Sequence, residues 1–245
     1  MKFETKDLTT VGILGAIVIM LGLTPLGFIP LGPLTITSLH IPVIIAGIIQ
    51  GPIVGGLVGL IFGAFSMFRS MTTPGPLAFV FLNPLISIVP RVLIGVVTGL
   101  VYKGLKDKDN SKLRIFMNIF WAIVVVALAV LTIKSFTADV NLANKIFSII
   151  FLIIAVVLLY LSVKNKKANF AIAVSSFFGT LTNSGLVLGL IYVLYAQRYV
   201  EALGISQDLA AKTIFSAFIT NGIPESIVAI LVASAVVNSF SKRRR

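Results

Sequence analysis

The sequence predicts an all-α integral membrane protein with about eight transmembrane helices. Hydrophobic residues make up 58% of the chain and charged residues only 11%, whereas a soluble domain carries roughly 25% charged residues. Residues 8–68, 115–133, 146–163 and 168–197 contain no Asp, Glu, Lys or Arg. A spanning helix needs about 20 mostly apolar residues. Each stretch is therefore long enough for one span, and the longer ones hold two.

Glycines, prolines and polar clusters divide these stretches into helices, because a backbone in lipid must satisfy its own hydrogen bonds. The predicted spans cover residues 8–23, 39–50, 52–69, 81–102, 115–133, 146–163, 168–196 and 211–240. The second and third spans are short, and we interpret them as tilted or partly re-entrant. We expect kinks at Pro90 and Pro224, because proline lacks the backbone donor. Residues 1–245 form a single transmembrane domain in this interpretation.

The basic residues predict the orientation in the membrane. Of the 20 Lys and Arg, 14 fall on the side that receives both termini. The other side receives Lys134, Lys145, Arg198 and Lys212, with Arg69 a fifth near the end of the third span. The positive-inside rule therefore predicts cytoplasmic N and C termini and an even number of spans. A six-span arrangement has the same orientation. Most of the basic residues behind the net charge of +12 lie in short loops and at the termini, where the positive-inside rule places them. We therefore expect no nucleic-acid partner.

Residues 24–38, between the first two spans, are rich in Pro and Gly, apolar and uncharged. A solvated loop would be polar. We interpret this segment as a lid that packs on the outer face; the alternative is a loop lying in the lipid interface.

Three strongly polar side chains fall deep within predicted spans, on three different helices: Arg91, Asn183 and Glu225. A charge at the membrane centre costs about 2.5–3.5 kcal/mol, so such residues indicate a functional site. A rise of about 1.5 Å per residue puts all three in the outer half of the membrane. We therefore expect them to share one cavity that is open to the outside.

The neighbours of these residues extend the candidate site. Asn221 lies four residues before Glu225 on one helix face, and Thr180 lies near the face of Asn183. A guanidinium suits a carboxylate, so we expect Arg91 to bind an anionic group while the amides orient the solute. Alternatively, Arg91 and Glu225 pair and hold helices together, and such a pair could also close the site.

Four further residues are candidates for contacts. His40, the single histidine, is a lid contact or a polar end cap, and alone it cannot form a metal site. Phe68 is placed to stack on a ring, although lipid-facing aromatics are commoner. Gly12 and Ala16 form a small-xxx-small pattern, which fits either a docking face for another membrane protein or internal packing.

Several kinds of chemistry have no signature in this chain. It has no cysteine, no phosphate-binding loop of an ATPase and no metalloprotease or hydrolase motif. We therefore predict no cofactor, no metal and no enzymatic activity; a membrane enzyme using Glu225 as base is the weakest alternative. No inverted repeat, the usual signature of a self-sufficient transporter, is evident. A binding site in a chain without an energy-coupling motif therefore points to a partner that supplies the energy.

Four groups of segments are distinctive in combination: Ile36–Gly47 with Gly51–Gly56, Pro90–Gly95 with Gly99–Lys103, Gly179–Asn183, and Asn221–Glu225. Through these segments the chain resembles the substrate-binding S components of energy-coupling factor (ECF) vitamin transporters. The resemblance covers about residues 5–105 and 168–242. The family usually has six spans, so residues 112–166 look like an inserted helical hairpin.

The resemblance implies a multi-pass protein of the bacterial plasma membrane that captures a vitamin under the first external loop. It implies docking of the first span on a membrane scaffold (T) component, while two cytoplasmic ATPases drive release of substrate inside. The family pattern at this dock is Ala-x-x-x-Ala, from which Gly12 departs. Arg91 and Asn183 resemble the pantothenate-type members, although pyridoxine-, hydroxymethylpyrimidine- and folate-type members look similar. The alternative function is a stand-alone channel or facilitator for a small solute.

Overall fold

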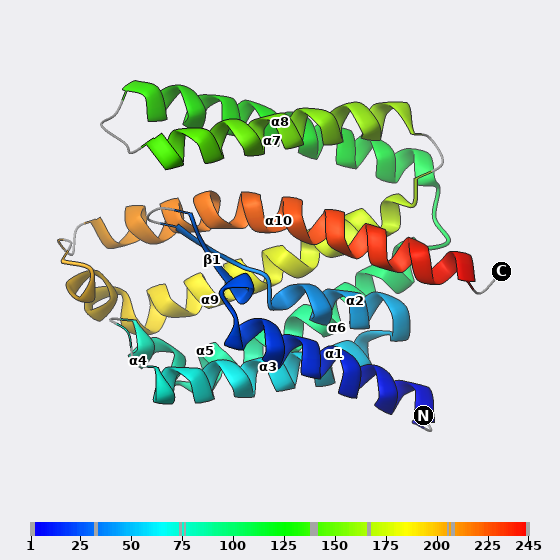
Figure 1. Cartoon of the computed structure of the whole chain (residues 1–245), viewed down its shortest axis with the longest axis horizontal. Coiled ribbons are helices and arrows are strands. Elements are labelled where there is room, and N and C mark those ends of the chain that lie inside the picture. The colour runs from blue at the N-terminus through cyan, green and yellow to red at the C-terminus, as the bar shows by residue number, and fades with distance from the viewer. Residues whose placement is uncertain are drawn as a thin grey trace.

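The computed structural model describes residues 3–31, 34–73, 75, 77–137, 142–165, 168–204, 206 and 209–243. In this part of the chain, long helices lie side by side along one axis, and both termini lie at the same end of the molecule (Figure 1). We call the opposite end, toward which α3 ends and α10 begins, the distal end (Figure 1).

The elements follow the predicted order closely. Their bounds are α1 Thr5–Leu23, η1 Pro25–Gly27, β1 Phe28–Leu31, β2 Leu34–Thr37, α2 His40–Gln50, α3 Pro52–Thr72, α4 Ala78–Phe81, α5 Pro84–Ser87, α6 Val89–Leu105, α7 Asn110–Thr137, α8 Leu142–Lys164, α9 Phe170–Ala202 and α10 Ala210–Arg243. Among the described residues, seven helical segments are long and apolar enough to cross a membrane. This agrees with an all-α membrane protein.

Helix α2 corresponds to the second predicted span, residues 39–50, and it is too short to cross the membrane. Its 11 residues extend over roughly 16 Å at about 1.5 Å per residue, about half of the hydrocarbon core. Residues His40 to Ile48 are all buried within the bundle. The sequence suggested a tilted or partly re-entrant segment, and α2 is a buried half-length helix.

Glycines allow α2, α3 and α6 to pack with their backbones in close approach. A Cβ atom placed on Gly95 of α6 would lie 2.0 Å from the carbonyl carbon of Gly55 in α3. A Cβ on Gly59 would lie 2.1 Å from the carbonyl oxygen of Arg91. This packing holds the start of α6, and with it Arg91, firmly against α3.

The helix breaks differ in part from the expected kinks. The predicted span 81–102 is broken into α4, α5 and α6, with Pro84 and Pro90 each in a first turn, where the missing donor costs nothing. Helix α10, by contrast, runs unbroken through Pro224. An unpredicted kink lies in α9 at Tyr195, whose φ of −140° and ψ of 16° are not helical.

The connection between α1 and α2 contains a short β-hairpin, which an all-α prediction did not include. Strands β1 and β2 pair antiparallel, with Phe28 opposite Thr37 at the base and Leu31 opposite Leu34 at the tip. Pairing satisfies backbone groups that an irregular loop at a membrane surface would leave without partners. The hairpin crosses α10 and reaches α8 (Figure 1).

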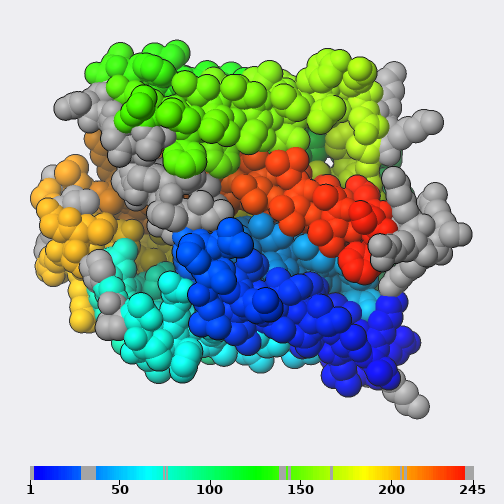
Figure 2. Space-filling model, in the orientation of Figure 1, coloured from blue at the N-terminus to red at the C-terminus, as the bar shows by residue number. Residues whose placement is uncertain are grey.

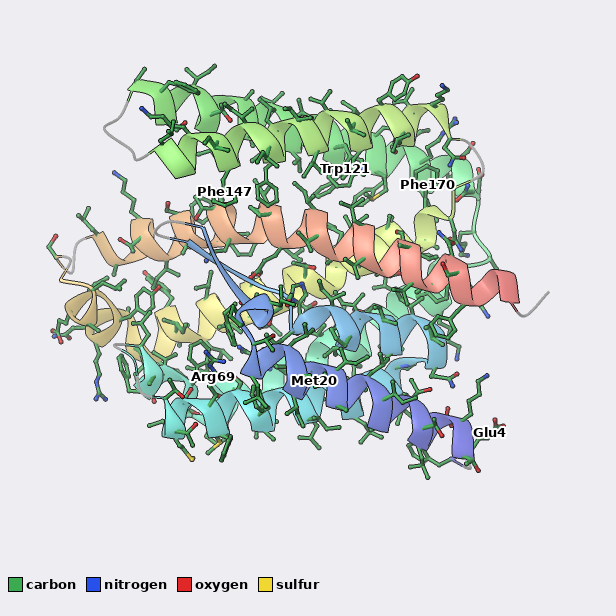
Figure 3. All side chains as sticks on the ribbon, viewed as in Figure 1. Glu4, Met20, Arg69, Trp121, Phe147 and Phe170 are labelled. Carbon is green, nitrogen blue, oxygen red and sulfur yellow. The ribbon has the colours of Figure 1, made fainter. Side chains whose placement is uncertain are left out.

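Helices α7 and α8 form a separate layer on the edge of the bundle (Figures 1 and 2). The Phe116 and Phe120 rings of α7 pack on Phe177 and Phe178 of α9. The side chain of Trp121 extends from α7 toward the bundle (Figure 3). Residues 112–166, the predicted inserted hairpin, cover most of this layer, with residues 138–141, 166 and 167 outside the described part.

Candidate ligand-binding site

A cavity of about 160 Å³ lies between α4, α6, α9 and α10. Its lining residues are Thr37, Leu77, Val80, Phe81, Arg91, Asn183, Ser184, Val187, Leu188, Ile191, Tyr199, Asn221 and Glu225. About half of these residues are apolar, and the polar ones come from four different elements, β2, α6, α9 and α10. This is the usual character of a small-molecule site.

Arg91 supplies the positive charge of the cavity. It sits in the first turn of α6 and is only 6% exposed. Its Nη1 donates to the carbonyl of Ile86 at 2.8 Å, and its Nε has no hydrogen-bond partner. The guanidinium also lies 5.2 Å from the Phe62 ring centroid and 5.4 Å from that of Phe81. A buried guanidinium with spare donors is a strong site for an anion.

Two amides supply hydrogen-bonding groups on the opposite helices. Asn183 of α9 is 6% exposed, and its Oδ1 is buried without a partner. The Oδ1 of Asn221 in α10 is also buried without a partner. A buried polar atom left unpaired costs about 1–3 kcal/mol. A ligand that donates hydrogen bonds to these oxygens would recover that cost.

Glu225 is 4% exposed, and both of its carboxylate oxygens have partners within the chain. Oε1 accepts the backbone N–H of Thr37 at 2.9 Å, and Oε2 accepts the Ser184 hydroxyl at 3.0 Å. In the part of the chain that the structure describes, no ion pair joins Glu225 to Arg91. The alternative in which these two residues merely pair and seal the interior therefore lacks its key contact.

Thr180 and His40 lie together outside the cavity. The Nε2 of His40 is 3.2 Å from the hydroxyl of Thr180, which itself donates to the carbonyl of Ser176 at 3.1 Å. Both side chains are fully buried. His40 therefore acts as the donor in this contact and begins α2 deep in the bundle.

The remaining predicted residues lie elsewhere. Phe68 of α3 is 58% exposed and is not among the lining residues, so it cannot stack on a solute in this cavity. The aromatic residues among the lining residues are Phe81 and Tyr199. Gly12 and Ala16 are exposed on α1, and a Cβ on Gly12 would have nothing within 4 Å. They do not serve internal packing, which was their alternative role.

Sequence reasoning did not name most of the lining residues, among them Tyr199 and Thr37. Tyr199 lies beyond the predicted end of its span at residue 196, and the kink at Tyr195 precedes the turn that brings it to the cavity wall. Thr37 contributes through a backbone N–H, which no side-chain pattern can reveal. The aromatic-rich stretch around Tyr195 was the one available signal for Tyr199.

Comparison with known proteins points in the same direction as this geometry. A family model described as "ECF transporter, substrate-specific component" matches residues 6–137. The matched region contains Arg91 and continues through α7, the first helix of the predicted insertion.

Two curated relatives carry related names. The chain is 32% identical over 113 residues to the "Pantothenate transporter PanT" of Leuconostoc mesenteroides, an alignment covering 43% of this chain and 55% of the relative. It is 28% identical over 131 residues to the "Pantothenic acid transporter PanT" of Lactococcus lactis, covering 47% of this chain and 67% of the relative. The chain thus spans about half to two thirds of the length of these relatives.

The family match, the apolar helices and the bacterial relatives together identify a multi-pass protein of the bacterial plasma membrane. Because the family model matches more than half of its residues, the chain belongs to the family of ECF transporter substrate-specific components.

Proposed function

We propose that this protein is the vitamin-binding subunit of an ECF-type importer, with pantothenate as its first candidate substrate. It captures the solute at the outer face, and partner subunits drive uptake with ATP. The observation that carries this proposal is the buried Arg91 guanidinium, with an unpaired Nε, beside a cavity that also exposes two amide groups.

The chemistry of pantothenate fits this set of groups. Its carboxylate matches the guanidinium fork, and its hydroxyl and amide groups can donate to the unpaired oxygens of Asn183 and Asn221. The apolar wall, including Phe81 and Val187, suits its methyl-bearing carbons. The names of the two relatives support the same substrate. Glu225 has both oxygens occupied and contributes indirectly.

The proposed orientation has the cavity near the outside. The termini and most Lys and Arg residues fall at one end, which the positive-inside rule makes cytoplasmic. The distal end, where the cavity and the β-hairpin lie, then faces the exterior. Deeper in the bundle, the His40–Thr180 contact and the buried α2 fill the interior, which favours capture over free conduction.

The proposed partners are a membrane T component and two cytoplasmic ATPases. Helix α1 supports the docking of a partner, because only 17% of its most apolar 18-residue stretch is buried within the chain. Gly12 and Ala16 lie on its exposed face beside Ile13 and Met20, which are 57% and 66% exposed. Such a smooth apolar face suits close helix packing against another membrane protein. Residues 112–166 remain, in this proposal, an insertion outside the six-helix body.

Binding and flux measurements on the purified protein test the proposal. Titration calorimetry in detergent should show one tight site for pantothenate and much weaker binding of pantothenol, which has an alcohol in place of the carboxylate. Liposomes containing this protein alone should show no pantothenate uptake. Equal affinity for both compounds would contradict the role of Arg91, and rapid uptake without partners would favour a facilitator.

A further inference from the structure

We propose that Arg69 and Glu225 are positioning residues that hold the base of the β-hairpin against the bundle and thereby set how long a ligand stays bound. Neither role depends on touching the ligand. The inference deepens the proposed function, since it assigns the hairpin as the lid of that same cavity.

The base of the hairpin is a single rung, in which Phe28 of β1 lies opposite Thr37 of β2. Next to it, the backbone N–H of Ser38 donates to the carbonyl of Gly27 at 3.1 Å, and the Ser38 hydroxyl donates to the carbonyl of Leu26 at 2.7 Å. Thr37 also lines the cavity. Movement of this rung would therefore open the cavity wall.

Arg69 holds one side of the rung. It projects from the last turn of α3, and its guanidinium lies 4.2 Å from the centroid of the Phe28 ring. Its Nη1 also donates to the carbonyl of Gly22 in the last turn of α1. Arg69 thus joins α3, α1 and the hairpin at the distal end (Figure 3). It is not among the residues that line the cavity.

Glu225 holds the other side of the rung. Its Oε1 accepts the N–H of Thr37, and its Oε2 accepts the hydroxyl of Ser184 on α9. A carboxylate that accepts two hydrogen bonds in a buried position is strongly held. Because an anionic ligand on Arg91 would be repelled by Glu225, an attachment of Glu225 to the lid is chemically more sensible than a direct contact with substrate.

Arg69 and Glu225, which we call the two clamps, each resist movement of the hairpin through a separate contact. The hairpin cannot move away without breaking the Glu225–Thr37 hydrogen bond and the Arg69–Phe28 contact. Both interactions are present before a ligand leaves, so their loss should raise the dissociation rate while the association rate changes little.

Dissociation kinetics of pantothenate from the full chain test this inference. Arg69→Ala should speed dissociation roughly tenfold, because it removes a cation–π contact and a charged hydrogen bond, with the association rate within about twofold of the original. The matched control is Arg198→Ala, which removes a guanidinium that lies 4.3 Å from the centroid of the Phe79 ring, an aromatic ring outside the hairpin. An unchanged dissociation rate in Arg69→Ala, or an equal effect in Arg198→Ala, would overturn the proposal.

Amide hydrogen exchange provides a readout that needs no ligand. The Thr37 N–H should exchange slowly in the original protein and faster in Arg69→Ala and Glu225→Ala. Glu225→Gln, whose side-chain oxygen can still accept this N–H, should stay close to the original. Unchanged Thr37 exchange in both alanine variants would disprove the clamps. Absence of pantothenate binding with protected Thr37 would instead disprove the substrate assignment alone.

Discussion

The cavity region and the α7–α8 layer bury polar groups in opposite ways. In α7 and α8, polar side chains largely have partners: the Ser162 hydroxyl donates to Asn118 at 2.6 Å, and the Ser135 and Ser148 hydroxyls donate to the carbonyls of Thr132 and Lys145 at 2.7 and 2.8 Å. Of the described buried polar groups in this layer, the Thr132 hydroxyl has no partner. Around the cavity, by contrast, a guanidinium and two amides, all on residues that line the cavity, retain unpaired buried atoms.

The two regions also differ in how much of their surface the chain covers. Within the most apolar 18-residue stretch of each helix, 44% is buried in the α5–α6 segment and in α10, whereas 11% is buried in α8. Polar pairs in a lipid-exposed layer act as contacts between helices. Unpaired polar groups in a covered region act as a site, because their cost to the fold must be offset by binding.

The largest effect is expected when the positive charge of Arg91 is removed from the cavity. Arg91→Ala should weaken pantothenate binding by about 2–5 kcal/mol, which is roughly 30-fold or more, because a buried charged contact is lost. Membrane insertion should persist. Calorimetry measures the affinity, and Lys164→Ala on α8 serves as the control that leaves it unchanged. Full affinity in Arg91→Ala would remove this residue from the site.

The second-largest effect is expected on thermal stability, when a glycine in the close α3–α6 contact is replaced. Gly95→Ala places a methyl group 2.0 Å from the carbonyl carbon of Gly55, and such overpacking costs about 1–3 kcal/mol. We expect a clearly lower midpoint of thermal unfolding in detergent. Gly104→Ala, where a Cβ meets nothing within 4 Å, should match or slightly exceed the original because alanine favours helix. Equal midpoints for both variants would contradict the close α3–α6 contact.

An amide in the cavity should show opposite effects on stability and binding. Asn183→Leu removes an unpaired buried oxygen, so the ligand-free protein should unfold at a higher temperature. The same change should weaken pantothenate binding by about 1 kcal/mol, or roughly fivefold, since one hydrogen bond is lost. Thermal unfolding with and without pantothenate measures both. A fall in ligand-free stability would indicate that Asn183 is structural.

A satisfied polar pair in the other layer should have the smallest effect. Ser162→Ala removes the hydrogen bond to Asn118, which is worth about 0.6 kcal/mol in a membrane bundle. Pantothenate affinity should stay the same, and the unfolding midpoint should fall slightly. A marked loss of affinity would show that the α7–α8 layer takes part in binding, and the contrast between the two regions would fail.

Local sequence patterns predicted most of the helices and several of the residues that line the cavity. Hydropathy located most spans to within several residues. Arg91, Asn183 and Glu225 were singled out by their depth, and Asn221 by its four-residue spacing from Glu225. They all line the cavity. Phe68 was wrong as a lining residue, because aromatic rings at that depth face lipid as readily as a site.

The sequence by itself determined the class of the protein, its helices and the depth of its buried polar groups, since hydropathy and helical rise are local properties. Only the tertiary structure decided that α2 is a buried half-length helix, that the loop before it forms a β-hairpin and that Glu225 contacts Thr37, 188 positions away. Such contacts depend on how helices distant in the chain pack together. That packing is set by shape and close backbone approach, which no short stretch of sequence records.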